Sequence, residues 1–161
     1  FFRGEVDKYT WQEAGSSFLP GELIAAFLWA QLQEAQNITN KRLDAWNYYD
    51  YLLMGRDIDH KIRRPFIPQE CQHNAHMYYI LLSPEIDRNA VLEKLRDSGI
   101  SAVFHYVPLH SAPGGLRYGR VHGNMTNTDN QSSQLIRLPM WYGVTKDQQE
   151  RVVDVLFKAL N

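Results

Sequence analysis

The chain has 161 residues, a length that suits one domain or one domain with a helical extension. Hydrophobic residues make up 44% of it and charged residues 22%, which excludes an intrinsically disordered or collagen-like protein. The formal net charge is −1, which argues against a nucleic-acid module or a binder of anionic membranes, because both need a positive field.

Three features bear on the compartment and the extent of the polypeptide. The single cysteine, Cys71, cannot close an intramolecular disulfide, so we expect a reducing, cytoplasmic location. The longest apolar run, residues 23–30, is far too short to span a bilayer. The chain opens at Phe1 with neither a Met nor a signal-peptide pattern, which predicts a piece of a longer polypeptide.

Residues 1–55 are predicted to form an extended lead-in followed by a long interdomain or interface helix. The helical pattern begins near residue 22 and is apolar nearly all round as far as residue 35, so it needs cover on more than one side. A subunit interface would supply that cover, and we expect a homodimer. A polar stretch at 36–41 predicts a break, after which helix continues to about Leu53, with Gly55 as its C-cap.

Residues 56–75 contain Pro65 and Pro68 and few apolar positions, which predicts a linker. The remainder, 76–161, is predicted to be a small α+β domain. It opens with a strand at 76–83, rich in aromatic and branched residues. A helix follows over 88–98, with Asp87 as its N-cap and Gly99 just past its end.

The second half of this domain is predicted to begin with a strand at 100–106 and a long loop at 107–130. That loop is too long for a simple connector, so it is a functional candidate. A short helix near Ser132 should lead into a strand at 136–139, and Thr145 with Gln148 forms a capping box for the last helix. The predicted fold class is therefore α+β, a small sheet with helices packed on one face.

The densest polar cluster is His105, Tyr106 and His110, at the end of a predicted strand and running into the long loop. These side chains could bind or orient a polar substrate. Alternatively, they cap the strand and pack under the loop. A metal site is disfavoured, because Pro108 interrupts the segment and no Cys or acidic residue lies within it.

A second cluster, Ser16 and Ser17 after Gly15, precedes the apolar helix. Hydroxyls and free N–H groups at a helix N-terminus can hold an anion such as a phosphate. The alternative is plain N-capping. Paired acid/base carboxylates, phosphate-binding P-loops and dinucleotide fingerprints are absent from the sequence.

Several segments, in order, resemble the DegT/DnrJ/EryC1/StrS sugar aminotransferases. The matching segments run Asp7–Trp11, Gly15–Leu19, Ala25–Leu32, Asn74–Ile80, Ala102–His110 and Arg137–Pro139. Family members are fold-type I pyridoxal-phosphate enzymes, so the resemblance implies that this chain is their C-terminal small domain with an interdomain helix. None of the chain's lysines sits in the family's Schiff-base context, so we assign no catalytic residue and expect no cofactor bound to this chain alone.

The resemblance also implies site residues. In many members an Asn before the helix reaches across the dimer to the cofactor phosphate, and the matching position here is Ser17, beside Ser16. His105, Tyr106 and His110 match the family's loop beside the substrate cleft, which implies contacts with the sugar nucleotide. No metal is implied.

The activity implied for the full-length enzyme is transfer of an amino group from glutamate to a dTDP-4-keto-6-deoxyhexose. The product would be a galacto-configured dTDP-4-amino-4,6-dideoxyhexose for cell-surface polysaccharide, namely enterobacterial common antigen. We expect this chain alone to be inactive. The alternative is a non-catalytic α+β binding or dimerisation module, which explains the composition equally well but not the ordered motifs.

Overall fold

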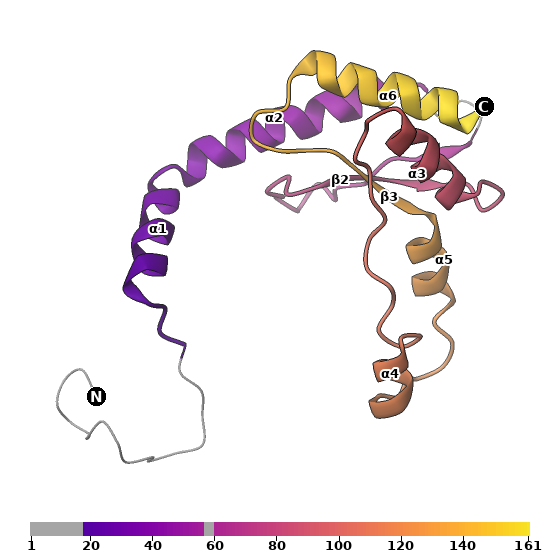
Figure 1. The fold of residues 1–161 in the computed structure, drawn as a ribbon, viewed down its shortest axis with the longest axis horizontal. Coiled ribbons are helices and arrows are strands. Elements are labelled where there is room, and N and C mark those ends of the chain that lie inside the picture. Colours follow the sequence, from indigo (N-terminus) through magenta and orange to yellow (C-terminus); the bar gives the residue numbers. More distant parts are fainter. Residues whose placement is uncertain (1–17, 57–59) are drawn as a thin grey trace. The chain divides into compact units, whose positions relative to one another are not determined.

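The computed structural model describes residues 18–56 and 60–161 (Figure 1). These residues divide into two units, one that ends at Ala35 and one that begins at Gln36. The first unit contains the helix α1 (Glu22–Gln33), as predicted, and none of its residues is buried. No helix in the described ranges is long and apolar enough to cross a bilayer.

Helix α2 (Ala35–Leu53) runs through the polar stretch at 36–41, so the predicted break there is wrong. The interruption falls instead at Glu34, between α1 and α2. The Gln36 side-chain amide donates to Asn40 Oδ1 at 2.9 Å, one helical turn away, and such pairs stabilise a helix through polar sequence. Gly55 has a φ of +74°, the left-handed conformation that its role as C-cap requires.

The second unit contains an antiparallel sheet of three strands in the order β1 (Ile62–Arg63), β2 (Tyr78–Leu82) and β3 (Leu135–Leu138). Tyr78 lies opposite Leu138, and Ile80 opposite Ile136. Because side chains alternate along a strand, these four side chains share one face. All four are buried, so this face of the sheet packs against the hydrophobic core.

Helices α2, α3 (Arg88–Asp97) and α6 (Lys146–Leu160) cover that face, and Figure 1 shows α6 lying along α2 and beside α3. Both predicted N-caps are confirmed. The Asp87 carboxylate accepts from Asn89 N at 2.8 Å, and Thr145 forms a reciprocal capping box with Gln148. The buried residues that the helices add to the core are Trp46, Tyr49, Leu53, Val91, Leu95, Val152, Val153, Leu156, Ala159 and Leu160.

The segment 56–75, for which we predicted a linker, contributes strand β1 to the sheet. It is also anchored by an ion pair, because Arg64 Nη1 lies 2.8 Å from Asp50 Oδ2 on α2. Asp50 Oδ1 accepts a hydrogen bond from the Tyr78 hydroxyl at 3.0 Å. Burial and this neighbouring carboxylate raise the pKa of Tyr78, so the phenol stays protonated and keeps donating.

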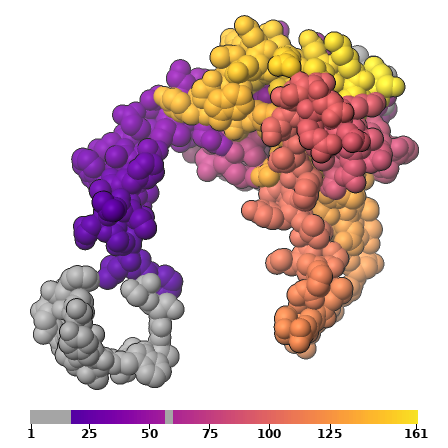
Figure 2. All heavy atoms as spheres, in the orientation of Figure 1, coloured from indigo at the N-terminus to yellow at the C-terminus, as the bar shows by residue number. Residues whose placement is uncertain are grey.

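The strand predicted at 100–106 does not form. Ala102 N bonds back to Ile100 O at 3.0 Å, and this tight turn leaves only Val103 paired with Arg137 of β3. The 107–130 segment is also not a plain loop. It contains α4 (Pro113–Tyr118) and the start of α5 (Thr126–Gln134), so the helix expected near Ser132 begins earlier. Figure 2 shows this region projecting from the body of the unit.

Candidate functional site

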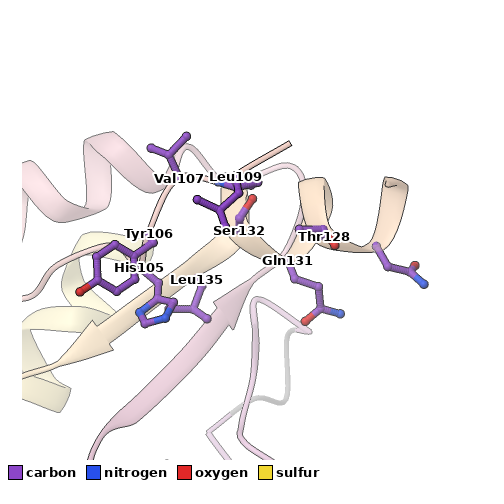
Figure 3. Close-up of a pocket in the computed structure, with 10 residues that line it drawn as sticks. His105, Tyr106, Val107, Leu109, Thr128, Gln131, Ser132 and Leu135 are labelled. Carbon is purple, nitrogen blue, oxygen red and sulfur yellow. The ribbon is translucent and has the colours of Figure 1, made fainter. Parts of the chain in front are cut away.

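A cavity of about 880 Å³ lies between the segment that leaves Val103 and helix α5 (Figure 3). One wall is residues 105–109, and the other is formed by α5 and the first residue of β3. The lining residues are His105, Tyr106, Val107, Pro108, Leu109, Asn127, Thr128, Gln131, Ser132 and Leu135. The structure therefore places two of the predicted substrate residues, His105 and Tyr106, in one cavity.

His105 is held by its neighbours and has one unsatisfied atom. Its ring lies edge-on to that of Tyr106, with centroids 5.0 Å apart. Its Nδ1 is buried and has no hydrogen-bond partner in the described part of the chain. An unpaired buried nitrogen is costly, typically about 1–3 kcal/mol. A hydrogen-bond partner at Nδ1 would therefore stabilise this side chain.

Tyr106 lines the cavity and has a free hydroxyl, which points away from the α5 wall in Figure 3. The residue is 81% exposed, and no hydrogen bond occupies its hydroxyl within residues 18–56 and 60–161. A phenol with one polar end and one apolar face suits a mixed surface that contacts both a ligand and solvent. Tyr106 is thus available to a ligand at the mouth of the cavity.

His110 lies outside the cavity lining and has a different contact. Its Nε2 is 2.9 Å from Oδ1 of Asp129 on α5, and its side chain is only 15% exposed. This contact joins the segment after residue 105 to the helix that forms the opposite wall. His110 therefore contacts α5, whereas His105 and Tyr106 line the cavity.

Arg88, the first residue of α3, contacts both walls of the cavity. Its guanidinium lies over the Phe104 ring, 5.5 Å from the centroid, and its Nη1 donates to the carbonyl of Ser132. One side chain thus holds the residue before His105 and the last turn of α5. The guanidinium–aromatic contact and the charged hydrogen bond both favour this arrangement.

The chemistry that the cavity offers is binding and orientation. The described lining residues include no Lys, Arg, Asp or Glu. In the described ranges, no group of three His, Cys, Asp or Glu side chains could hold a metal ion. The described lining can therefore hold an uncharged polar group.

The α5 wall of the cavity was not predicted from the sequence. Asn127, Thr128, Gln131 and Ser132 follow the spacing of one helical face, but α5 is polar all round, so no apolar period marks it as a helix. Ser16 and Ser17, predicted to bind phosphate, lie outside the described residues.

A family model described as the DegT/DnrJ/EryC1/StrS aminotransferase family matches residues 2–157. Two curated relatives are similar. A dTDP-4-dehydro-2,3,6-trideoxy-D-glucose 4-aminotransferase of Saccharopolyspora spinosa is 24% identical over 92% of this chain and 37% of its own length. A dTDP-3-amino-3,4,6-trideoxy-alpha-D-glucose transaminase of Micromonospora megalomicea subsp. nigra is 26% identical over 76% of this chain and 32% of its own. The chain thus spans about a third of each relative.

The crystal structure of DesV from S. venezuelae, in complex with a ketimine intermediate, superposes with a TM-score of 0.84 at 21% identity. The match covers 98% of this chain and 41% of DesV. At this identity the likeness establishes the fold. It is the α+β fold predicted from the sequence, that of the C-terminal small domain of a fold-type I pyridoxal-phosphate-dependent transferase.

Proposed function

The chain belongs to the DegT/DnrJ/EryC1/StrS aminotransferase family, and from this membership we propose that it forms the C-terminal part of a sugar-nucleotide aminotransferase. The observation that supports this most directly is the cavity, which gathers His105 and Tyr106 of the family-like segment against the polar face of α5. An uncharged cavity with apolar and hydrogen-bonding walls suits a substrate ring that also has apolar and polar edges.

The cofactor proposed for the complete enzyme is pyridoxal 5′-phosphate, which acts as an electron sink in amino transfer. The described residues of this chain do not fit it. Lys61 Nζ donates to Leu160 O and Asn161 Oδ1, and Lys94 Nζ donates to Ala159 O. No described lysine lines the cavity. As the resemblance implies, the Schiff-base lysine would come from residues outside this chain, and this chain would contribute Ser16 and Ser17 toward the phosphate.

The finer parts of the proposal concern the reaction. The substrate would be a dTDP-4-keto-6-deoxyhexose, the donor glutamate, and the product the galacto 4-amino sugar for enterobacterial common antigen. The two curated relatives act on dTDP sugars but are named for different carbons, C4 and C3. The choice of C4 therefore rests on the sequence motifs. The enzyme would be a cytoplasmic homodimer, and this chain alone would be inactive.

The roles proposed for the cavity residues follow from their geometry. Tyr106 would hydrogen-bond a polar group of the substrate through its free hydroxyl, and His105 would orient a second group from the cavity wall. His110 would act through Asp129, by keeping the two walls at a fixed separation. Of the three residues predicted from the sequence, only Tyr106 and His105 would touch the substrate.

The test measures both kinetics and stability in the complete enzyme that contains this chain. Removing a buried hydrogen-bond partner costs about 1–3 kcal/mol, so His105→Ala should lower kcat/KM by roughly 5- to 150-fold. For the more exposed Tyr106, Tyr106→Phe should fall at the low end of that range. Tyr118→Phe is the matched control, because Tyr118 is 78% exposed and does not line the cavity. Unchanged kcat/KM in both cavity variants, with a loss of stability alone, would contradict the proposed roles.

The competing function is a non-catalytic dimerisation module, and one observation favours it. Helix α1 presents exposed Leu23, Phe27 and Trp29, the kind of apolar surface that proteins bury against a partner. Transaminase activity in the complete enzyme would decide against the module. Dimerisation without any activity toward sugar nucleotides would decide for it.

A further inference from the structure

Helix α5 presents three unoccupied polar side chains to the cavity. Asn127, Thr128 and Gln131 all line it, and none makes a side-chain hydrogen bond within the described ranges. Ser132 shares their face, but its hydroxyl already donates to the carbonyl of Asp129 at 3.0 Å. Figure 3 shows the Thr128 and Gln131 side chains across the cavity from the loop residues. The three free groups are thus placed to accept a ligand.

The helix that bears them is held in place independently of any ligand. The His110–Asp129 contact anchors its N-terminal half, and Arg88 holds the carbonyl of Ser132 in its last turn. A polar helix with both halves anchored presents a defined row of donors and acceptors. Such a row can discriminate between ligands, because its backbone is already ordered and a ligand has to order only the side chains on binding.

The charges around the cavity select the uncharged part of a sugar nucleotide. A diphosphate needs Lys, Arg or a free helix N-terminus to compensate its charge. The described lining contains no Lys or Arg, and Asp129 in the first turn of α5 offsets the positive end of that helix. The diphosphate must therefore be neutralised elsewhere.

The chemistry of the two walls suits a ring. Val107, Pro108 and Leu109 offer an apolar surface to C–H or methyl groups. On the opposite wall, the amides of Asn127 and Gln131 can each donate and accept, which matches hydroxyl and carbonyl groups. A ring whose hydroxyls face these amides would gain hydrogen bonds that a different arrangement of hydroxyls would not make, so the two would bind with different affinities.

We propose that Asn127, Thr128 and Gln131 determine substrate specificity by binding the uncharged, hydroxyl- or carbonyl-bearing ring of the sugar nucleotide. This proposal rests on the proposed function for the identity of the ligand. The ring would be the deoxyhexose or the pyrimidine nucleoside, which share this chemistry. The binding itself requires neither the cofactor nor catalysis.

The first experiment titrates the 161-residue chain with fragments while recording its amide NMR spectrum. The probes are methyl 6-deoxy-glucopyranoside, thymidine and inorganic pyrophosphate. Fragments of this size bind with roughly millimolar Kd. We expect at least one neutral fragment to shift the resonances of residues 127–132, and its identity tells which ring is bound. Shifts there with pyrophosphate alone, or with no probe, would overturn the proposal.

The second arm uses variants with a matched control. The double variant Asn127→Ala and Gln131→Ala should weaken binding of the active fragment by roughly 3- to 30-fold, as expected for the loss of one or two hydrogen bonds. Asn130→Ala removes an exposed amide from the same helix outside the cavity lining and should leave binding unchanged. Equal effects in the two would contradict the proposal. An unchanged spectrum elsewhere confirms that the variants fold.

In the complete enzyme, the double variant should change the ratio of kcat/KM between two sugar nucleotides that differ in one hydroxyl. A uniform fall for both substrates would instead indicate a structural role. This separates the two proposals. If the enzyme shows no transamination but the fragments still bind at α5, the proposed function fails and the binding site stands. Transamination with an unchanged ratio would refute the specificity role alone.

Discussion

Tyr49 on α2 allows a test in which one oxygen atom is removed from the core. The residue is fully buried, and its hydroxyl donates to the carbonyl of Pro139, just after β3, at 2.7 Å. Burial raises the pKa of Tyr49, so the hydroxyl remains a donor throughout the neutral range. Tyr49→Phe deletes this bond but keeps the ring that packs against Tyr78, with centroids 5.3 Å apart.

The magnitude follows from what the substitution leaves unpaired. An orphaned buried acceptor costs about 1–3 kcal/mol. The Pro139 residue is half-buried, so water can partly replace the phenol, and we expect a loss of about 1–2 kcal/mol in the free energy of unfolding. For a unit of this size, about 1 kcal/mol corresponds to roughly 3–6 °C in Tm, so Tm should fall by roughly 3–12 °C.

The assay is thermal and urea unfolding followed by circular dichroism, with Tyr51→Phe as the control. Tyr51 lies on the same helix but is 67% exposed, and its hydroxyl has no hydrogen bond within the described residues. Its loss should change the free energy of unfolding by less than about 0.5 kcal/mol. If the two variants unfold at the same temperature, the Tyr49 bond does not stabilise the fold and the reasoning is refuted.

Three further predictions concern the loop, the pH dependence and the first helix. A Cβ at Gly115 would lie 1.6 Å from Leu109 O, whereas a Cβ at Gly114 would meet nothing within 4 Å. Gly115→Ala should therefore increase the amide hydrogen-exchange rate over residues 105–119. An equal increase in Gly114→Ala would contradict this prediction. The hydroxyl of Tyr48 donates to the Glu150 carboxylate, and this hydrogen bond raises the pKa of Tyr48 from 10.0 to about 12. The stabilisation by this hydrogen bond should therefore be complete below pH 10 and be lost as the pH rises toward 12. Urea titrations across that range should show a smaller decline in Tyr48→Phe, and identical declines would disprove the link. The exposed apolar residues of α1 should make the chain self-associate at micromolar concentration. Light scattering should show a smaller species for Trp29→Lys than for the wild type. A monomeric wild-type chain would contradict the prediction.

Local signals were enough to predict the caps and most of the core elements. Asp87, Thr145 and Gln148 form the predicted caps because a cap depends on residues that are adjacent in the chain. The strand at Tyr78–Leu82 was predicted from its aromatic and branched residues, and the helix α6 from an apolar period that reflects a single buried face. The ordered motifs likewise predicted the family, since a motif is read without knowing the fold.

Other features depended on contacts between distant residues. Nothing in the local sequence shows that Arg64 meets Asp50, or that the segment before it adds a strand to the sheet. The run at 100–106 has strand-like residues, yet the turn at Ile100–Ala102 leaves it with one pair to β3. Propensity is a weak guide in such a place, because strand formation depends on which backbone groups a neighbour leaves free.

The candidate site also has one part that the local sequence predicted and one part that depends on contacts between distant residues. His105 and Tyr106 stand out in the sequence because two polar ring residues adjoin a Pro in an otherwise apolar stretch, whereas the α5 wall has no such signal. The run 126–134 is polar on every face, so its helix is stabilised by tertiary contacts, namely the Asp129 contact with His110 and the Ser132 carbonyl bond to Arg88. Sequence alone thus determined one wall of the cavity. Its other wall, and the contact of His110 with Asp129, were decided by tertiary structure, because only the folded chain brings residues 19 positions apart to within 2.9 Å.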